Sequence, residues 1–461
     1  MIQPLRIGFV ALARPTFDTA LAAEVTAQVR AGLLATGQVT LEGPEALVMD
    51  LQAAQAAAEG LQDAPIDLLL VWQASFADAT MVVALARAVA APAAPATPAP
   101  ATPAPLLLWA PPEERTGGRL RLNAFCGINL AAHGLHREGI GYDYLYAAPD
   151  DPAALDKVLL LARAGRAARL LRSARIGRFG LNPDGFAPCT FDGEALAALA
   201  GIRVVQRGLS EVFDGARTAA PAGVDDALAE LGRRVAGLAE LDQPSLRKTL
   251  GAYLTLADLA REHAYDGLAV RCWPEFFTEL GCAACGAMSM LSDRMIPCSC
   301  EADVNGTVTQ LMLQWLSGEP AFGTDMVGFD VHRDEAVLWH CGLAPLSMAD
   351  PEFQPRGTIH SNRKLPLLME FPLKPGRVTL ARLSQATGAY RLVVGSGEML
   401  RAPLSFSGTS GVLRFDQSGR EVLDTIMAEG LDHHVSLTYG DHMDALLALA
   451  RMLGLPVLRL T

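Results

Sequence analysis

Apolar runs alternate with longer Ala- and Leu-rich stretches over the first 150 residues of the chain. The short runs are LRIGFVAL, IDLLLVWQ and PLLLWA, whereas the stretches between them, such as FDTALAAEVTAQVRAGLL and ATMVVALARAVA, have helical spacing. Strands and helices in alternation predict a parallel sheet that is covered by helices. We therefore expect an N-terminal α/β domain over residues 1–150.

One segment of this region has a different composition. Residues 91–105 read APAAPATPAPATPAP, in which the prolines remove hydrogen-bond donors and the small side chains offer little surface to bury. We expect a mobile loop inserted into the domain, because the apolar run PLLLWA directly after it suits the same sheet. The alternative is a linker between domains.

Two further regions follow. Residues 151–317 again alternate helical stretches, such as AALDKVLLLARAGRAARLLRS, with short strands, such as IRVVQRG, and predict a second α/β domain. Residues 318–461 are rich in β-branched and turn residues, as in EAVLWHCG and AYRLVVGSGEM. The expected fold is therefore α/β, with two open parallel-sheet domains followed by a β-rich, antiparallel or barrel-like C-terminal domain.

Composition and charge exclude several classes of protein. We find no uninterrupted apolar run of about 18 residues that could span a bilayer, so no membrane insertion is expected. The net charge is −12 and no cluster of Lys or Arg stands out, so no nucleic-acid partner is expected. The N-terminus lacks the small-residue cleavage site of a secretion signal, which favours a cytoplasmic protein.

The eight cysteines favour reduced thiols, because nothing in the sequence points to an oxidising compartment. CAAC at 282–285 and CSC at 298–300 together offer four thiolates, which is the number that zinc or an iron–sulfur cluster takes. The CxC spacing is tighter than in usual zinc knuckles and the neighbouring residues are apolar. Free buried cysteines are therefore the preferred interpretation.

Polar residues that suit a metal site gather in two segments. The first segment, CSCEADVNG at 298–306, comes directly before an expected helix, and PAFGTD follows that helix. Glu301 and Asp325 therefore bracket one helix. The second segment, GLDHHVSLTYGDH, offers His433, His434 and His442 around an expected strand. Carboxylates with imidazole suit a divalent ion. From spacing alone, however, acids that cap helices or turns and histidines that are partly solvated are the preferred explanation of the pattern.

The order of these residues resembles the L-fucose isomerase family. An acid in an E-x-D-x-x-G turn, an aspartate 24 residues later and a near-terminal histidine before a Y-G segment correspond here to Glu301, Asp325 and His434. The resemblance implies that these three residues are metal ligands and that the two carboxylates also transfer protons. It is weaker across the N-terminal third of the chain.

The chemistry implied by this resemblance is the interconversion of an aldose and its ketose through an enediol. The reaction removes a proton beside a carbonyl, and a metal that holds both sugar oxygens stabilises the charge that develops. Two carboxylates and one imidazole leave room for sugar oxygens in an octahedral site. Mn²⁺ is the expected ion, with Mg²⁺ and Co²⁺ as alternatives.

Other polar residues are candidates for contact with the sugar. Glu275, in RCWPEFF, follows an expected strand and is either a site residue or a surface acid. His340, in LWHCG, is either a buried strand residue or a substrate contact, and His433 lies beside the proposed ligand. The resemblance adds Arg14 and Trp72, which the family presents to the sugar of a neighbouring subunit.

We therefore expect a metal-dependent ketol isomerase acting on a pentose, a 6-deoxyhexose or a related modified sugar. A small-molecule sugar is the expected partner, in a homo-oligomer, a trimer or a hexamer, whose subunits share active sites. Two alternatives stay open, a non-catalytic sugar-binding or regulatory protein of the same fold and a metal-dependent lyase or aldolase. The complete set of three candidate ligands favours the enzyme.

Overall fold

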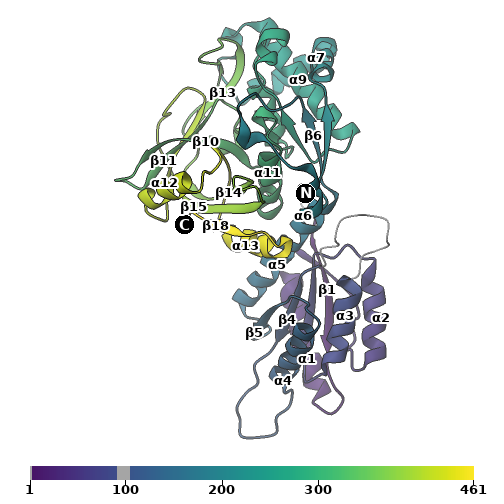
Figure 1. Ribbon diagram of the computed structural model, residues 1–461. Coiled ribbons are helices and arrows are strands. Elements are labelled where there is room, and N and C mark those ends of the chain that lie inside the picture. Colours follow the sequence, from purple (N-terminus) through teal and green to yellow (C-terminus); the bar gives the residue numbers. More distant parts are fainter. Residues whose placement is uncertain (1–2, 91–103, 461) are drawn as a thin grey trace. The chain divides into compact units, whose positions relative to one another are not determined.

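The computed structural model of the protein describes residues 3–90 and 104–460, and the chain divides into two compact units, residues 1–172 and 173–461 (Figure 1). The Ala/Pro-rich segment expected at 91–105 lies almost entirely outside the described residues. Among the described residues, no helix is both long and apolar enough to cross a bilayer.

The first unit is built on a five-stranded parallel sheet in the order β2-β1-β3-β4-β5. Its strands are β1 (Leu5–Leu12), β2 (Val39–Glu42), β3 (Leu68–Gln73), β4 (Leu106–Ala110) and β5 (Asp143–Tyr146). Its helices are α1 (Thr19–Ala35), α2 (Leu51–Gln62), α3 (Ala79–Ala90), α4 (Ala124–Arg137) and α5 (Pro152–Ser173). The central strands β3 and β4 are buried at every residue, which explains their unbroken apolar sequences. The expected N-terminal α/β fold is confirmed.

Helix α5 corrects the domain boundary predicted at residue 150. Arg166 and Arg169 on this helix both bind the fully buried Asp67, at 3.1 and 2.7 Å, just before β3. Gly165 packs so closely that a Cβ there would lie 1.9 Å from the Asp67 carbonyl oxygen. The helix therefore belongs to the first unit, and the chain divides at residue 172.

The second unit begins with a four-stranded parallel sheet in the order β7-β6-β8-β9. Its strands are β6 (Arg175–Phe179), β7 (Arg203–Arg207), β8 (Gly267–Val270) and β9 (Cys298–Ser299). Its helices are α6 (Gly193–Ala200), α7 (Leu209–Thr218), α8 (Pro221–Gly232), α9 (Gln243–Glu262), α10 (Cys285–Asp293) and α11 (Val304–Ser317). This is the second parallel-sheet region that the sequence predicts.

The C-terminal part forms a nine-stranded sheet that closes into a barrel. Its strands are β10 (Phe322–Asp330), β11 (Glu335–His340), β12 (Arg356–Ile359), β13 (Pro366–Pro372), β14 (Gly376–Ser384), β15 (Arg391–Leu400), β16 (Thr409–Phe415), β17 (His434–Tyr439) and β18 (Val457–Arg459). The antiparallel ring β16-β11-β10-β17-β14-β15 closes because β15 also pairs with β16. Helices α12 (Gly419–Ala428) and α13 (Met443–Leu453) complete this part. The barrel-like domain is confirmed.

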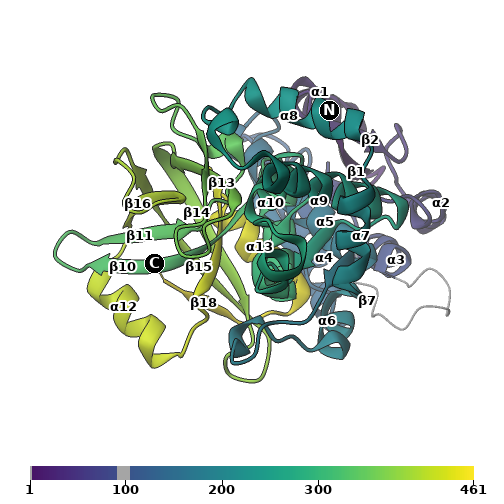
Figure 2. The same cartoon turned by 90° about the horizontal axis from the view of Figure 1, so that it is seen from above.

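The parallel sheet and the barrel share one core, so the boundary predicted at residue 318 separates two folds within one compact unit. Helix α11 is buried along nearly its whole length and packs against β8 on one side and against β14 and β17 on the other. Figure 2 shows the barrel strands beside helices α9 and α10 of the same unit. Residues that precede and follow α11 can therefore meet at this junction.

Candidate active site

Three elements of the second unit bring Glu301, Asp325 and His434 together. Glu301 lies in a single 3₁₀ turn between β9 and α11, Asp325 lies on β10, and His434 is the first residue of β17. Asp325 and His434 stand directly opposite each other in the antiparallel β10–β17 pair, so their side chains project from the same face. The two acids that bracket α11 therefore both lie near His434.

Nε2 of His434 lies near a carboxylate oxygen of both Glu301 and Asp325. Nε2 of His434 lies 3.4 Å from Asp325 Oδ1 and 3.7 Å from Glu301 Oε2. Adjacent oxygen or nitrogen ligands around an octahedral ion, bonded at about 2.1 Å, lie about 3.0 Å apart. Among the described residues, Glu301 and His434 form a group of mutually close ligand atoms with Cys189, and Asp325 and His434 form another with His433. A single ion held by Glu301, Asp325 and His434 would therefore require the two carboxylates to move toward each other.

Asp303 fixes the proton on the His434 ring. Its Oδ2 lies 2.9 Å from His434 Nδ1, while its Oδ1 accepts a hydrogen bond from the Gly306 backbone at the start of α11. Burial alone would raise the pKa of Asp303, but Arg382 and His434 hold this pKa well below its ordinary range. The ionised carboxylate only accepts, so His434 carries its hydrogen on Nδ1 and turns the lone pair of Nε2 toward Glu301 and Asp325.

A buried ionic network holds Asp303 in place. Arg382 on β14 is 3% exposed and contacts Asp303 Oδ2 at 2.5 Å and Asp432 Oδ1 at 3.0 Å. Ser384 donates its hydroxyl hydrogen to the other oxygen of Asp432, also at 2.5 Å. Because a buried guanidinium needs charge partners, the two aspartates and Arg382 stabilise one another. The network connects the barrel to the start of α11.

Glu301 is held in an unusual backbone conformation. Its φ is 57°, and the following Ala302 has a φ of 54°, in the left-handed region that residues with a Cβ rarely adopt. The indole N–H of Trp273 donates to Glu301 Oε1 at 3.0 Å, which leaves Oε2 directed at His434. Burial would raise the pKa of Glu301, but His433, His434 and this hydrogen bond lower it. Backbone strain at this position is typical of a functional residue.

Two family profiles match this chain. The profile described as the fucose/sulfoquinovose isomerase N-terminal domain matches residues 8–159, and that of the L-fucose isomerase C-terminal domain matches residues 369–461. A sulfoquinovose isomerase from Priestia aryabhattai is 29% identical over 98% of this chain and 99% of its own length. Those from Alkalicoccus urumqiensis and Clostridium sp. (strain MSTE9) are each 31% identical, over 77% and 76% of this chain and 80% and 79% of their own lengths.

The chain belongs to the fucose/sulfoquinovose isomerase family. This membership makes the protein an aldose–ketose isomerase that acts on a sugar, and it confirms the family recognised from the E-x-D-x-x-G turn. The predicted ligands Glu301 and Asp325 lie between the two matched regions, whereas His434 lies inside the C-terminal one.

The residues of this family member fit a divalent metal ion. Asp325 Oδ1 is buried and has no hydrogen-bond partner among the described residues, although it lies within 3.4 Å of the lone pair on His434 Nε2. An unpaired buried carboxylate oxygen is costly unless a donor or a cation meets it. A cation held by Glu301, Asp325 and His434 would satisfy this oxygen.

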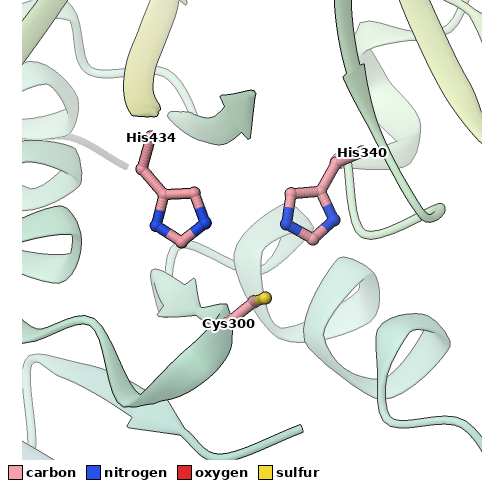
Figure 3. Close-up of side chains that lie close together, drawn as sticks. All are labelled: Cys300, His340 and His434. Atoms are coloured by element: carbon pink, nitrogen blue, oxygen red, sulfur yellow. The ribbon is translucent and has the colours of Figure 1, made fainter. Parts of the chain in front are cut away.

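Other groups of possible ligands include cysteines. Cys300, His340 and His434 converge in one group, in which the two imidazole rings face each other and the Cys300 sulfur lies close by (Figure 3). Cys189 joins Glu301 and His434 in another. The hydrogen bond with Cys272 and burial raise the pKa of Cys300 well above its ordinary value, and burial raises that of Cys189. The raised pKa values disfavour the thiolate forms of both side chains in the metal-free protein.

The cysteine segments do not form the four-thiolate site that was considered. Cys272 contacts Cys300 at 3.4 Å and Cys285 contacts Cys341 at 3.3 Å, as separate pairs of thiols. In the described part of the chain, no group of three converging ligands consists of cysteines alone. The expectation of free, mostly buried cysteines is confirmed.

The residues proposed for sugar contact in this unit have different surroundings. His433 stacks on His434 with ring centroids 4.2 Å apart, its side chain is 40% exposed, and the Glu301 carboxylate raises its pKa. His340 is buried, and its Nδ1 accepts a hydrogen bond from the Cys341 backbone at 2.9 Å, with its ring 6.1 Å from that of His434. Glu275 pairs with Arg271 at 2.8 Å. His433 and His340 therefore adjoin the proposed ligands.

The two residues of the first unit that were candidates for sugar contact, Arg14 and Trp72, differ in their exposure to solvent. Arg14 follows β1 and is exposed, with its guanidinium 5.6 Å from the Phe76 ring centre. Trp72 lies inside β3, fully buried, and donates its indole N–H to Thr26 at 3.1 Å. A side chain without exposed surface cannot touch a sugar, so the structure contradicts Trp72 as a substrate contact. Arg14 stays a prediction.

Sequence reasoning missed the residues that position the ligands. Asp303 stands in the E-x-D-x-x-G turn and was available as a signal, but its contact with His434 depends on a strand 131 residues later. Arg382 and Asp432 carry no local motif. Trp273 is two residues before Glu275 in the segment that was singled out, and it contacts the proposed ligand directly.

Proposed function

We propose that this protein is a divalent-metal-dependent sulfoquinovose isomerase, which interconverts sulfoquinovose, a glucose with a sulfonate on C6, and the corresponding ketose. The observation that carries the proposal is the approach of both carboxylates, Glu301 and Asp325, to Nε2 of the buried His434. The substrate is supported by the sulfoquinovose isomerases that match this chain over nearly its whole length.

A divalent ion bound here would supply a positive charge beside the C1 and C2 oxygens of the open-chain sugar, and Mn²⁺ is the preferred ion, with Mg²⁺ and Co²⁺ as alternatives. Glu301, Asp325 and His434 would hold this ion. The oxygen-rich set with one imidazole suits these ions better than a thiolate-binding metal.

Glu301 and Asp325 are the proposed proton-transfer pair. One carboxylate takes the proton from C2 of the aldose and returns it to C1, while the hydroxyl proton moves from O2 to O1. The sugar passes through an enediol, and no outside oxidant or reductant is needed. Trp273 holds one oxygen of Glu301 in a hydrogen bond and so fixes the orientation of this carboxylate.

Asp303 and Arg382 position the site without touching the sugar. Asp303 holds the His434 ring in the tautomer that presents Nε2, and Arg382 keeps Asp303 ionised. We further propose a cytoplasmic homo-oligomer, a trimer or a hexamer, in which the exposed Arg14 of one subunit reaches the sugar of another. An active monomer in solution would contradict the shared site.

A substrate panel tests this function. The purified protein with Mn²⁺ would be offered sulfoquinovose, glucose, L-fucose and L-arabinose, with products resolved by NMR. We expect a ketose with an intact carbon chain from sulfoquinovose, and far slower turnover of the other sugars. Preferential turnover of L-fucose would contradict the proposed substrate, and cleavage into shorter fragments would indicate a lyase or aldolase.

A further inference from the structure

The hairpin between β12 and β13 carries two adjacent cations, Arg363 and Lys364, on its exposed surface. Its sequence, HSNRKL, contains no acid. Across residues 3–90 and 104–460, no carboxylate pairs with either cation within 4.0 Å, whereas most arginines of the second unit have such a partner. These charges are therefore available to an anion from outside the chain.

Arg363 lies against an aromatic wall that ends at a proposed metal ligand. Its guanidinium carbon is 4.9 Å from the ring centre of Trp273 and 5.1 Å from that of Phe277. Trp273 donates its indole N–H to Glu301 Oε1 at 3.0 Å. One indole therefore separates Arg363 from Glu301, and stacking on two rings holds the planar guanidinium in position.

The ring of His360 cannot accept from all the donors that face it. Burial, with the charge of Arg363, lowers the pKa of His360 to about 4, so the ring is neutral and has one lone pair. Three donors face the ring: the backbone N–H groups of Asn362 and Arg363 lie 3.2 and 3.3 Å from Nδ1, and Arg363 Nη1 lies 3.2 Å from Nε2. If Nδ1 accepts from the two backbone groups, the N–H on Nε2 faces the guanidinium N–H.

Two donors that face each other favour an anionic oxygen that accepts from both. A sulfonate has three such oxygens in a compact, fully ionised group, which matches the fork of an arginine. An extended hexose spans about 5 Å from C2 to C6, with carbon–carbon bonds of about 1.5 Å. Arg363 and Glu301 both contact the Trp273 indole, the first 4.9 Å from its ring centre and the second 3.0 Å from its Nε1.

We propose that Arg363, with the N–H of His360 beside it, binds the C6 sulfonate of the sugar and so determines the specificity of the isomerase. This inference rests on the proposed function. Trp273 would then serve two roles, since it orients Glu301 at one end and supports Arg363 on its ring face.

The test compares Arg363→Gln with the wild type on sulfoquinovose and on 6-deoxyglucose, which has the same ring stereochemistry without the sulfonate. For sulfoquinovose we expect kcat/KM to fall roughly 10- to 100-fold, mainly through KM, because a charge-assisted contact to the bound anion is lost. Turnover of 6-deoxyglucose should not change. Arg363→Lys, which keeps the charge but not the fork, should lose less.

Arg356→Gln is the matched control, because Arg356 begins the same hairpin and is also exposed, but it pairs with Glu240. Inhibition by the C6-sulfonated alditol, which cannot isomerise, gives a second readout and should weaken in Arg363→Gln alone. Wild-type KM and inhibition in Arg363→Gln would overturn the sulfonate site while the proposed function stands. Absence of sulfoquinovose turnover by the wild type would instead overturn the proposed function.

Discussion

Replacing Asp303 by Asn tests whether this buried carboxylate positions the metal ligand His434. The change keeps the shape of the side chain and removes its charge from the 2.9 Å contact with His434 Nδ1. A hydrogen bond that involves a charged group contributes about 1.5–3 kcal/mol, and loss of such a carboxylate behind a ligating histidine weakens metal binding roughly 10- to 100-fold. We expect a loss of Mn²⁺ affinity within this range.

The same change also removes one of the two carboxylates that neutralise Arg382. Breaking a buried charge pair costs about 3–5 kcal/mol, and because Asp432 remains beside Arg382 we expect the lower end of this range in the free energy of unfolding. Asp432→Asn is the matched control. It removes the other carboxylate from Arg382 but leaves the His434 contact intact, so it should lower stability without a comparable loss of metal affinity.

Isothermal titration with Mn²⁺ and urea unfolding of the metal-free protein measure the two effects separately. We expect Asp303→Asn to lose both Mn²⁺ affinity and stability against unfolding, and Asp432→Asn to lose mainly stability. Unchanged Mn²⁺ affinity in a folded Asp303→Asn variant would refute the role of Asp303 behind His434. Equal losses of affinity in both variants would show that the ionic network as a whole, rather than this one contact, supports the ligand.

Three further predictions follow from the site and its surroundings. Exhaustive chelation should abolish isomerisation and Mn²⁺ should restore it, and full activity after chelation would exclude a metal role. Glu301→Gln and Asp325→Asn should each lower turnover by at least roughly 100-fold and remove the deuterium that the ketose gains in D₂O, with metal occupancy measured alongside. The pKa of His360 is about 4 in the folded protein, against an ordinary value of 6.5 in the unfolded chain. Acidification from pH 7 to 4.5 therefore protonates this side chain mainly in the unfolded state, and it should lower the free energy of unfolding by about 2 kcal/mol. His360→Asn should reduce this loss, and an identical pH dependence in the variant would contradict the assignment.

The alternation of strands and helices could be predicted because each local pattern agrees with the final structure. The apolar runs at β1, β3 and β4 are the buried centre of a parallel sheet, and the turn-rich segments after residue 318 form the barrel. The end of the first unit could not be placed, because an amphipathic helix does not specify which sheet it covers. The contacts of α5 with Asp67 decide this, and they depend on residues about 100 positions earlier.

The candidate ligands could be predicted from the order of Glu301, Asp325 and His434, whereas their supporting residues could not. A buried network such as Asp303, Arg382 and Asp432 joins three distant segments, and each residue alone looks like an ordinary surface charge. Trp72 was misassigned because a strand buried on both faces hides its aromatic side chain completely.

Anomalous diffraction at the manganese edge, from crystals grown with Mn²⁺, tests the proposed metal centre most directly. The account predicts one strong peak within about 2.4 Å of His434 Nε2 and of a carboxylate oxygen of both Glu301 and Asp325. A peak bound instead by Cys300 and His340, or no peak near His434, would contradict it.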